Sequence, residues 1–461
     1  MSDAPTDRAD TPALARPLAV VVLAAGRGKR MRSRLPKVLH PVGGRPMLAH
    51  VLATARALAP ERVAVVVGHE GARVAEAARA ADPDVLIAEQ AVQRGTGDAV
   101  ACAREALAGF EGDVLVLYAD VPLLSVATLA RLVGLPGAMV RVLGFEAAEP
   151  GGYGRLVLAP DGRLERIVEA RDASVAEAAI TACNSGVMAA DAALLWRLLA
   201  RVTNANAQGE YYLTDVPGLA RAEGVAAGVA FCDEAEVQGV NDRVDLARAE
   251  AAFQTRARRA AMLAGATLAD PSSVHLSWDT TLGRDVSVGP SVVFGPGVAV
   301  EDGARIEAFC HLADVCIGAG ARVGPFARLR GGTAVGPDCR IGNFVEMKNA
   351  DLGAGVKAGH LAYVGDASVG AGANLGAGTV TCNYDGVSKH RTTIGAGAFV
   401  GTNSSLVAPV AIGEGAYVAT ATTVTRDVEP GALAIARVEQ TNRPGAVARL
   451  MGRLRARLAK D

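Results

Sequence analysis

The sequence predicts two folds in one chain: an α/β domain with a mostly parallel sheet, followed by a left-handed parallel β-helix of hexapeptide repeats. Short β-branched runs alternate with helical patterns in the first half, and aliphatic residues recur every six positions in the second. Glycine accounts for 53 of the 461 residues, about 11% against a usual share of roughly 7%. A fold with many tight turns explains this excess.

The first domain is expected over residues 18–240. Its buried strands are LAVVVLA at 18–24, RVAVVVG at 62–68, DVLIA at 84–88 and DVLVLYAD at 113–120. These runs are apolar on both faces and are separated by helical patterns, which is typical of a parallel sheet covered by helices on both sides. Ligands bind such sheets at the carboxyl ends of the strands, so the site of this domain is expected there.

Residues 241–264 are predicted to form a helical linker, and helical patterning stops soon afterwards, at Pro271. The β-helix is expected over residues 265–430, with three six-residue sides per coil and inward residues that become buried only when coils stack. These inward residues are Val288, Phe294, Val300, Ile306, Ile317, Val323, Leu329, Val335, Ile341, Met347, Ile394, Val400, Leu406, Ile412, Val418 and Val424.

Three segments fall outside these regular patterns. The run from Gly376 to Arg391 breaks the six-residue period and is predicted to leave the prism as a loop carrying polar and basic groups. Residues 1–17 have too little apolar content to order themselves and are expected to be a disordered extension. Residues 431–461 form a basic, amphipathic tail that we expect to cover the end of the β-helix or to pack on a neighbouring subunit.

Charge and cysteine content exclude several classes of function. The 47 basic and 48 acidic residues give a net charge of −1, which provides no basic field for nucleic acid or an anionic membrane. The seven cysteines are scattered and form no Cys-x-x-Cys pair, so neither a disulfide framework nor a zinc site is indicated. The start is not signal-like and no apolar run approaches about 18 residues, so a cytoplasmic location is expected.

A glycine-rich turn with several cations follows the first strand. Gly26 and Gly28 allow the backbone to approach a ligand, and the basic side chains nearby suit a polyphosphate; they are Arg27, Lys29, Arg30, Arg32, Arg34 and Lys37. No Gly-Lys-Ser/Thr ends the turn, so it is not a Walker loop, and Met31 occupies the third glycine position of a dinucleotide fingerprint. A purely structural turn is the alternative.

A carboxylate ends the strand DVLVLYAD. Asp120 is placed to bind Mg²⁺, which takes one or two carboxylates together with substrate phosphates. Asn241, in the segment GVND at 239–242, supplies a second oxygen ligand if that segment folds back to the same edge. For Asp120 alone, a helix N-cap or turn residue is the alternative.

His360 lies among small residues of the repeat region, in KAGHLAYVGD. The repeat is unusually polar around it, with Arg330, Lys348, Tyr363, Asn374, Asn383, Tyr384 and Lys389. Cations suit a phosphorylated sugar, and an imidazole suits removal of a proton near pH 7. A surface histidine without a catalytic role is the more common alternative.

Over nearly its whole length the sequence resembles the family of bifunctional N-acetylglucosamine-1-phosphate uridyltransferases/glucosamine-1-phosphate acetyltransferases of bacterial cell-wall precursor synthesis. The motifs in the first half are LAAGRGKRM, LPKVLH, QRGTGDA, LYADVPL, GYGR, IVEARDA, NSG, NAQGEYYLTD and GVND. Those in the second half are PFARLR, GNFVEMK, KAGHLAYVGD, NLGAGTVTCNYDG, FVGTNSSLVAP and TTVTRDV. Order and spacing both match, and the resemblance implies a Rossmann-like nucleotidyltransferase fold joined to an acetyltransferase β-helix.

For the first half, the resemblance implies a site for UTP and N-acetylglucosamine 1-phosphate, with Mg²⁺ held by Asp120 and Asn241. Arg30 and Lys37 are the implied catalytic cations, which neutralise the phosphates. The other implied nucleotide and sugar contacts are Leu23, Ala24, Ala25, Gly26, Gln90, Gly95, Thr96, Tyr118, Ala119, Gly154, Glu169 and Asn184.

For the second half, the resemblance implies that His360 is the general base that frees the amine of glucosamine 1-phosphate to attack acetyl-CoA. The implied sugar phosphate contacts are Arg330, Lys348, Tyr363 and Asn374. Those implied for acetyl-CoA are Ala377, Asn383, Tyr384, Thr402, Thr420 and Arg437. Thr402 replaces a serine and keeps the hydroxyl, whereas Thr420 replaces an alanine and adds bulk near the coenzyme.

The leading hypothesis is an enzyme that acetylates glucosamine 1-phosphate at the β-helix and uridylylates the product at the sheet, giving UDP-N-acetylglucosamine. The resemblance also implies a homotrimer assembled through the β-helix. One alternative is a single-function sugar-1-phosphate nucleotidyltransferase whose β-helix only assembles or binds an effector; the polar residues around His360 argue against it. The other is a non-enzymatic scaffold, which the joint presence of the glycine turn, Lys37, Asp120 and Asn241 makes improbable.

Overall fold

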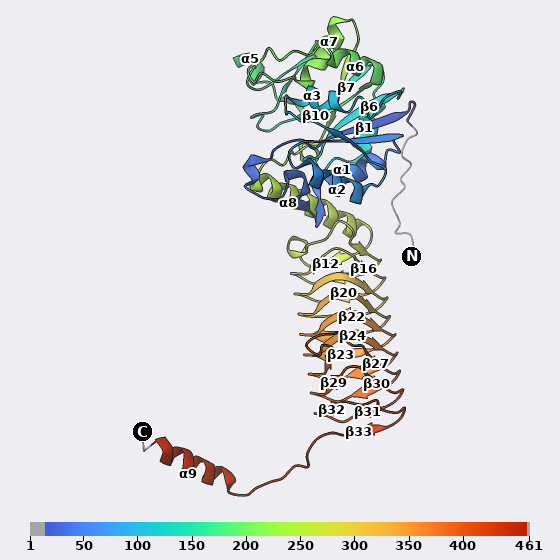
Figure 1. Ribbon diagram of the computed structural model, residues 1–461, viewed down its shortest axis with the longest axis vertical. Helices are drawn as coiled ribbons and strands as arrows, with labels where there is room; N and C mark the ends of the chain where they lie inside the picture. The colour runs from blue at the N-terminus through green and yellow to red at the C-terminus, as the bar shows by residue number, and fades with distance from the viewer. Residues whose placement is uncertain (1–13, 459–461) are drawn as a thin grey trace. The chain divides into compact units, whose positions relative to one another are not determined.

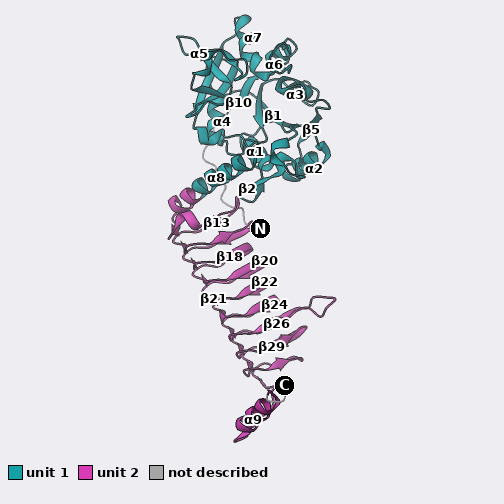
Figure 2. Ribbon diagram, turned by 90° about the vertical axis from the view of Figure 1, so that its left-hand side faces the viewer, with its two compact units in different colours: residues 1–257 teal, residues 258–461 magenta. Residues whose placement is uncertain are grey.

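The computed structural model describes residues 14–458 and divides into two compact units, Met1–Ala257 and Arg258–Asp461. Figure 1 gives the element labels and Figure 2 colours the two units. The first unit is α/β and the second is a stack of short parallel strands. Both predicted fold classes are therefore confirmed, in the predicted order.

The first unit is built on a nine-stranded sheet that is mostly parallel. Strand β10 is the exception on the main path, because it runs antiparallel to β6 and β7. The path is β11 (Ala227–Cys232), β7 (Val140–Glu146), β10 (Ala182–Asp191), β6 (Asp113–Tyr118), β1 (Leu18–Leu23), β4 (Arg62–Val67) and β5 (Leu86–Glu89), and β8 (Arg155–Leu158) and β9 (Leu164–Val168) extend it.

Helices cover both faces of this sheet because its central strands are apolar on both sides. Val20 and Val22 of β1 belong to one core cluster, whereas Ala19 and Val21 belong to the other, as the period of a strand requires. The first cluster includes α1 (Met47–Arg56), α2 (Gly71–Ala81) and α4 (Val126–Val133), and the second includes α3 (Thr96–Cys102), α6 (Ala192–Leu199) and α7 (Val216–Ala222).

The helix α8 (Arg243–Leu263) occupies the segment expected to be a linker. Its N-terminal half packs on the first unit, where Ala249 and Phe253 join a small cluster with Val42 and Val240. A Cβ added at Gly43 would lie 2.3 Å from the Phe253 ring, so only glycine permits this approach. The first half of α8 is therefore part of the α/β unit.

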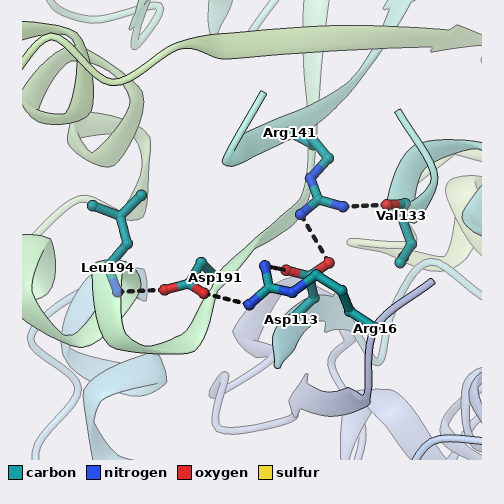
Figure 3. Close-up of polar contacts among 6 residues, drawn as sticks. All are labelled: Arg16, Asp113, Val133, Arg141, Asp191 and Leu194. Carbon is teal, nitrogen blue, oxygen red and sulfur yellow. Dashed lines mark hydrogen bonds and ion pairs between the residues drawn. The ribbon is translucent and has the colours of Figure 1, made fainter. Parts of the chain in front are cut away.

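Before β1, Arg16 joins a network of charged side chains that also includes the buried Asp113 and Arg141 (Figure 3). Arg16 contacts the carboxylates of Asp113 at 2.9 Å and Asp191 at 2.6 Å, and Arg141 contacts the other oxygen of Asp113 at 2.8 Å. Asp191 also caps α6 by accepting the backbone N–H of Leu194. Residues 1–17 were predicted to be disordered. Of these, residues 1–13 lie outside the described part of the chain, whereas Arg16 is held in place by the contacts above.

The second unit is a parallel β-helix whose strands stack coil upon coil (Figure 1). The strands of its ten-stranded sheet are β12 (Thr267–Leu268), β14 (Ser287–Val288), β17 (Arg305–Ile306), β19 (Arg322–Val323), β21 (Arg340–Asn343), β23 (Lys357–His360), β25 (Asn374–Leu375), β28 (Phe399–Val400), β31 (Tyr417–Val418) and β33 (Leu433–Ala434). Neighbouring coils pair residue for residue in this sheet, for example Val323 with Ile341.

The twelve-stranded sheet covers the rest of the prism. Its strands are β13 (Thr281–Leu282), β15 (Val293–Phe294), β16 (Val298–Val300), β18 (His311–Ile317), β20 (Arg328–Val335), β22 (Glu346–Leu352), β24 (Tyr363–Val369), β26 (Val380–Cys382), β27 (Thr392–Ile394), β29 (Ser405–Val407), β30 (Val410–Ile412) and β32 (Thr423–Val424). Every inward residue predicted from the six-residue period is buried.

Two predictions on this unit are refined. The segment that leaves the coils is shorter than Gly376–Arg391, because β26 keeps its register with β29 and the excursion begins at Asn383. It is pinned by a bridge between Tyr384 and Lys389, and Figure 2 shows it standing out beside β24 and β26. The tail contains α9 (Ala446–Leu458), a basic amphipathic helix with no buried residue.

Candidate functional sites

A cavity of about 220 Å³ lies at the carboxyl ends of β1 and β6. Ten predicted site residues line it: Leu23, Ala24, Ala25, Gly26, Lys37, Gln90, Gly95, Thr96, Tyr118 and Asp120. Gly95 has φ +117°, and a Cβ there would lie 2.5 Å from the carbonyl oxygen of Tyr211, so a larger residue would displace this wall. The structure thus brings together segments that are up to about one hundred residues apart in the sequence.

The glycine turn positions Lys37 at this cavity. Gly28 has φ +56°, and a Cβ there would lie 2.7 Å from Cβ of Lys37, so the lysine packs directly against the glycine. The Nζ of Lys37 is ion-paired with Asp120, and both side chains are largely buried. The turn therefore delivers a cation to the strand-end carboxylate.

Asn241 folds back to the same edge, as expected. The backbone N–H of Val240 donates to the carbonyl oxygen of Asp120 at 2.9 Å, which joins the GVND segment to the end of β6. Arg30 donates to Oδ1 of Asn241 at 2.9 Å. Arg30 and Asn241 line a neighbouring cavity of about 550 Å³ rather than the first one.

The oxygens of Asp120 and Asn241 fit a magnesium ion. Among residues 14–458, no cluster of three or more His, Cys, Asp or Glu side chains could hold a metal by itself. Each of these oxygens is paired with a cationic side chain, and Mg²⁺ typically takes one or two carboxylates together with substrate phosphates and water.

The predicted sugar contacts Gly154, Glu169 and Asn184 line neither cavity. Glu169 accepts a hydrogen bond from Thr214 at 2.9 Å, and its burial raises the pKa of the carboxyl above its ordinary value. Burial, with the negative charges of Glu169 and Asp120, also raises the pKa of Tyr118. The carbonyl oxygen of Gly154 accepts the N–H of the buried Asn184, and Ala119 is completely buried.

In the β-helix, several predicted residues form one column at a corner of the prism. Extending the registers of β23, β25, β28 and β31 aligns His360 with Ala377, Thr402 and Thr420 on successive coils. Coils repeat about every 4.8 Å, so the column extends about 14 Å beyond His360. This column is long enough for an elongated ligand.

The cations predicted to bind a phosphate lie on the adjoining face. Arg330 and Lys348 are paired residues on neighbouring strands, and Arg330 donates to Glu346 at 2.8 Å. A hydrogen bond and the positive charge of Lys389, together with the charge of Arg330, lower the pKa of Lys348. Three basic side chains thus lie close together, with Glu346 and Asp366 as acidic neighbours, an arrangement that can receive an anionic ligand.

Tyr363 lies on the same face, next to its own strand neighbour Gly365. A Cβ at Gly365 would lie 2.4 Å from the hydroxyl of Tyr363, so glycine makes room for the phenol. Asn374 lies on the other sheet, where it pairs with Lys357 and Phe399. No described contact joins Asn374 to the cation cluster.

The remaining predicted coenzyme contacts come from the excursion and the tail. Asn383 donates to Asp366 at 2.5 Å, and Asn349 donates to the other oxygen at 2.6 Å. Burial opposes ionisation of Asp366, but these bonds and the charges of Lys389 and Lys348 outweigh it and lower its pKa.

Tyr384, at the start of the excursion, is exposed. In the tail, Arg437 donates to the carbonyl oxygen of Thr420 at 2.6 Å, which joins that segment to the corner column.

Sequence reasoning missed two residues of this arrangement and left a third without a role. Asn343 precedes His360 by 17 residues, one coil, and its Oδ1 lies 2.6 Å from Nδ1 of His360. Asp366 holds Asn383, and Lys389 was noted as polar but given no role. The coil length of 17 or 18 residues could have indicated Asn343, because a residue 17 positions before His360 lies next to it on the preceding coil.

The chain is similar to known enzymes over almost all of its length. Residues 20–186 match the model of the MobA-like NTP transferase domain. The bifunctional protein GlmU of Paracoccus denitrificans is 55% identical over 95% of this chain and 98% of its own length. Those of Paramagnetospirillum magneticum and Sphingopyxis alaskensis are 53% and 52% identical over 96% of this chain and 98% and 99% of theirs.

A solved structure of an inositol-1-phosphate CTP transferase from T. maritima gives a TM-score of 0.41 at 16% identity. The match covers 49% of this chain and 90% of that chain. Within residues 14–458, no helix is both long and apolar enough to cross a membrane.

Proposed function

The chain belongs to the bifunctional GlmU family, and we propose that the two sites described above divide that family's two reactions between them. The chain carries uridyltransferase and acetyltransferase activities in the biosynthesis of UDP-N-acetylglucosamine. The cavity at β1 and β6 is assigned to uridylyl transfer, and the corner column with its cation cluster to acetyl transfer. The cytoplasmic location stays a prediction.

Uridylyl transfer requires two anions to approach each other. An oxygen of N-acetylglucosamine 1-phosphate attacks the α-phosphorus of UTP while pyrophosphate leaves, so catalysis consists of positioning and charge neutralisation. Arg30 and Lys37 supply fixed positive charge at the phosphates once they release Asn241 and Asp120. A magnesium ion held by those two oxygens adds Lewis acidity when bound.

Acetyl transfer requires a free amine. The nitrogen of glucosamine 1-phosphate attacks the thioester carbonyl of acetyl-CoA, and His360 takes a proton from this amine as the nitrogen–carbon bond forms. Arg330, Lys348 and Lys389 hold the phosphate, since these three basic side chains lie close together on one face. The column of Ala377, Thr402 and Thr420 receives the coenzyme, and Arg437 joins the tail to its far end.

The observation that supports this proposal is that ten of the residues predicted for uridylyl transfer line one cavity, whereas His360 is aligned with Ala377, Thr402 and Thr420 on successive coils of the β-helix. The test uses Asp120→Ala and His360→Ala, each assayed for both reactions in one preparation. Asp120→Ala should lose about 10²-fold or more in uridylyl transfer and keep acetyl transfer; His360→Ala should show the reverse, by roughly 10²- to 10⁴-fold.

Two matched controls are available in the chain. His311 is an exposed histidine of the same prism, and Asp161 is an exposed carboxylate of the α/β unit outside both cavities. Alanine at either position should leave both rates unchanged. A folded protein in which one site variant loses both activities would contradict the division of labour.

We also propose that the β-helix assembles into a homotrimer. Phe309, Phe326 and Phe344 stack at one corner with ring centroids 4.9 and 5.2 Å apart, and about half of each side chain is exposed. All three residues have positive φ, a backbone conformation that is unfavourable for a bulky residue by about 1 kcal/mol or more. Burial of their exposed rings against another copy of the chain would offset this unfavourable free energy.

Sedimentation velocity tests this assembly. The wild type should sediment as a trimer, and Phe326→Asp as a smaller species with reduced acetyl transfer. Val175→Asp, at an exposed position of the α/β unit, is the control. A fully active wild-type monomer would overturn the proposal.

A further inference from the structure

The side chain of Asn343 contacts the ring of His360 directly. Its Oδ1 lies 2.6 Å from Nδ1 of the imidazole, and the two residues are paired in the register of β21 with β23. The N–H of Leu361 donates to the carbonyl oxygen of Asn343 at 3.0 Å, so the backbones on both sides of the contact are fixed as well. The contact between Asn343 and His360 is therefore fixed by the pairing of two neighbouring coils.

An amide oxygen can only accept a hydrogen bond. Opposite Oδ1, the Nδ1 of His360 must carry the ring proton, and Nε2 then carries the free lone pair. If the amide were turned so that its NH₂ group faced the ring, Nδ1 would accept and Nε2 would be protonated, which would leave the histidine unable to take a proton there. The identity of the atom at 2.6 Å thus decides which ring nitrogen is basic.

We propose that Asn343 is a positioning residue for acetyl transfer: it fixes the orientation and tautomer of His360 so that Nε2 acts as the base. This inference rests on the proposed function, in which His360 is that base. The amine proton moves to Nε2 as the nitrogen–carbon bond forms. The carbon–sulfur bond then breaks, its electron pair leaves on sulfur, and the thiolate takes the proton back from Nε2 to give free coenzyme A.

The neutrality of Asn343 has a further consequence. A carboxylate at the same position would also accept from Nδ1, but its negative charge would favour the protonated imidazolium, which cannot act as a base. The charged residues on the three strands that meet here are Arg340 on β21 and Lys357 on β23, whereas β25 contributes Asn374 and Leu375. Asn343 therefore orients the ring without adding a negative charge.

Two substitutions separate this role from a structural one. Asn343→Leu keeps the volume but cannot accept a hydrogen bond, and it should lower kcat for acetyl transfer on the order of 10²-fold with KM for both substrates changed less than about twofold. Asn343→Asp keeps the acceptor and should retain most of the kcat at high pH, while the acidic limb of its kcat–pH profile moves to higher pH. Uridylyl transfer should be unchanged in both.

The ¹⁵N shifts of the His360 ring, identified by comparison with His360→Ala, provide an independent readout. The wild type should show a protonated Nδ1, and Asn343→Leu a mixture of tautomers. Wild-type kcat in Asn343→Leu, or an unmoved acidic limb in Asn343→Asp, would overturn the inference. If instead His360→Ala itself acetylates normally, the proposed base is wrong, and the two failures are thereby distinguished.

Discussion

Arg141 and Asp113 form a buried ion pair at 2.8 Å, with only 6% and 3% of their side chains exposed. Figure 3 shows that the same carboxylate also meets Arg16. Removal of Asp113 would leave the charge of Arg141 buried without its partner, which typically costs about 3–5 kcal/mol. Asp113→Ala should therefore shift the urea midpoint of the α/β unit strongly downward, as followed by far-UV circular dichroism.

Arg16 provides the matched control, since it contributes to the same network from a side chain that is 44% exposed. Exposed pairs contribute about 1 kcal/mol or less, so Arg16→Ala should shift the midpoint far less. Equal midpoints for the two variants would mean that burial of Arg141 does not determine the cost.

Glu169 gives uridylyl transfer a predicted pH dependence. Burial raises the pKa of its carboxyl group, so the carboxylate that we expect to hold the sugar is lost on acidification at a higher pH than for an ordinary glutamate. The hydrogen bond from Thr214 acts in the opposite direction and lowers the pKa. Thr214→Val should therefore move the acidic limb of kcat/KM for N-acetylglucosamine 1-phosphate further toward neutral pH.

The substrate phosphates titrate identically in both proteins, so the difference between the two profiles belongs to the protein. Thr128 is a control of the same kind, because it donates at 3.1 Å to Glu236, which lines neither cavity. Thr128→Val should leave the limb in place. A limb that does not move in Thr214→Val would show that Glu169 does not govern sugar binding.

Much of the β-helix could be predicted from the sequence, because every coil needs inward apolar residues at the same spacing. Every third of a coil needs one inward apolar residue, so positions such as Ile341 and Val400 could be read from spacing alone. The period failed near Leu312 and Leu352, where a side of the coil is five residues long, and both residues are nevertheless buried.

The sites were less accessible to sequence reasoning, because their contacts join distant segments. No local pattern shows that Lys37 pairs with Asp120 or that Arg30 reaches Asn241. The register of the coils, which depends on where each corner falls, brings Asn343 to His360. The residue types were predictable, whereas their partners required the fold.

Gly365 is predicted to control the binding of the amino sugar phosphate. A Cβ there would meet the Tyr363 hydroxyl at 2.4 Å, and the phenol is the group free to move. Gly365→Ala should raise KM for glucosamine 1-phosphate about tenfold, the loss of roughly one good hydrogen bond, with little change in thermal stability. Steady-state kinetics of acetyl transfer measure this change.

Gly359 offers the comparison on the same coil, because a Cβ there meets nothing within 4 Å. Gly359→Ala should keep the wild-type KM. If the two alanine variants bind the sugar phosphate equally well, Tyr363 does not contact it.

Arg437 is predicted to keep the tail at the coenzyme end of the corner column. Its guanidinium donates to the carbonyl oxygen of Thr420 at 2.6 Å, three coils beyond His360. Arg437→Ala removes this bond, so KM for acetyl-CoA should rise about tenfold. The value of kcat should hold, because His360, the proposed base, lies at the other end of the column. Arg443→Ala, an exposed arginine of the same tail, should leave KM unchanged; an equal rise in both variants would mean that the basic charge of the tail, rather than its attachment at Thr420, attracts the coenzyme.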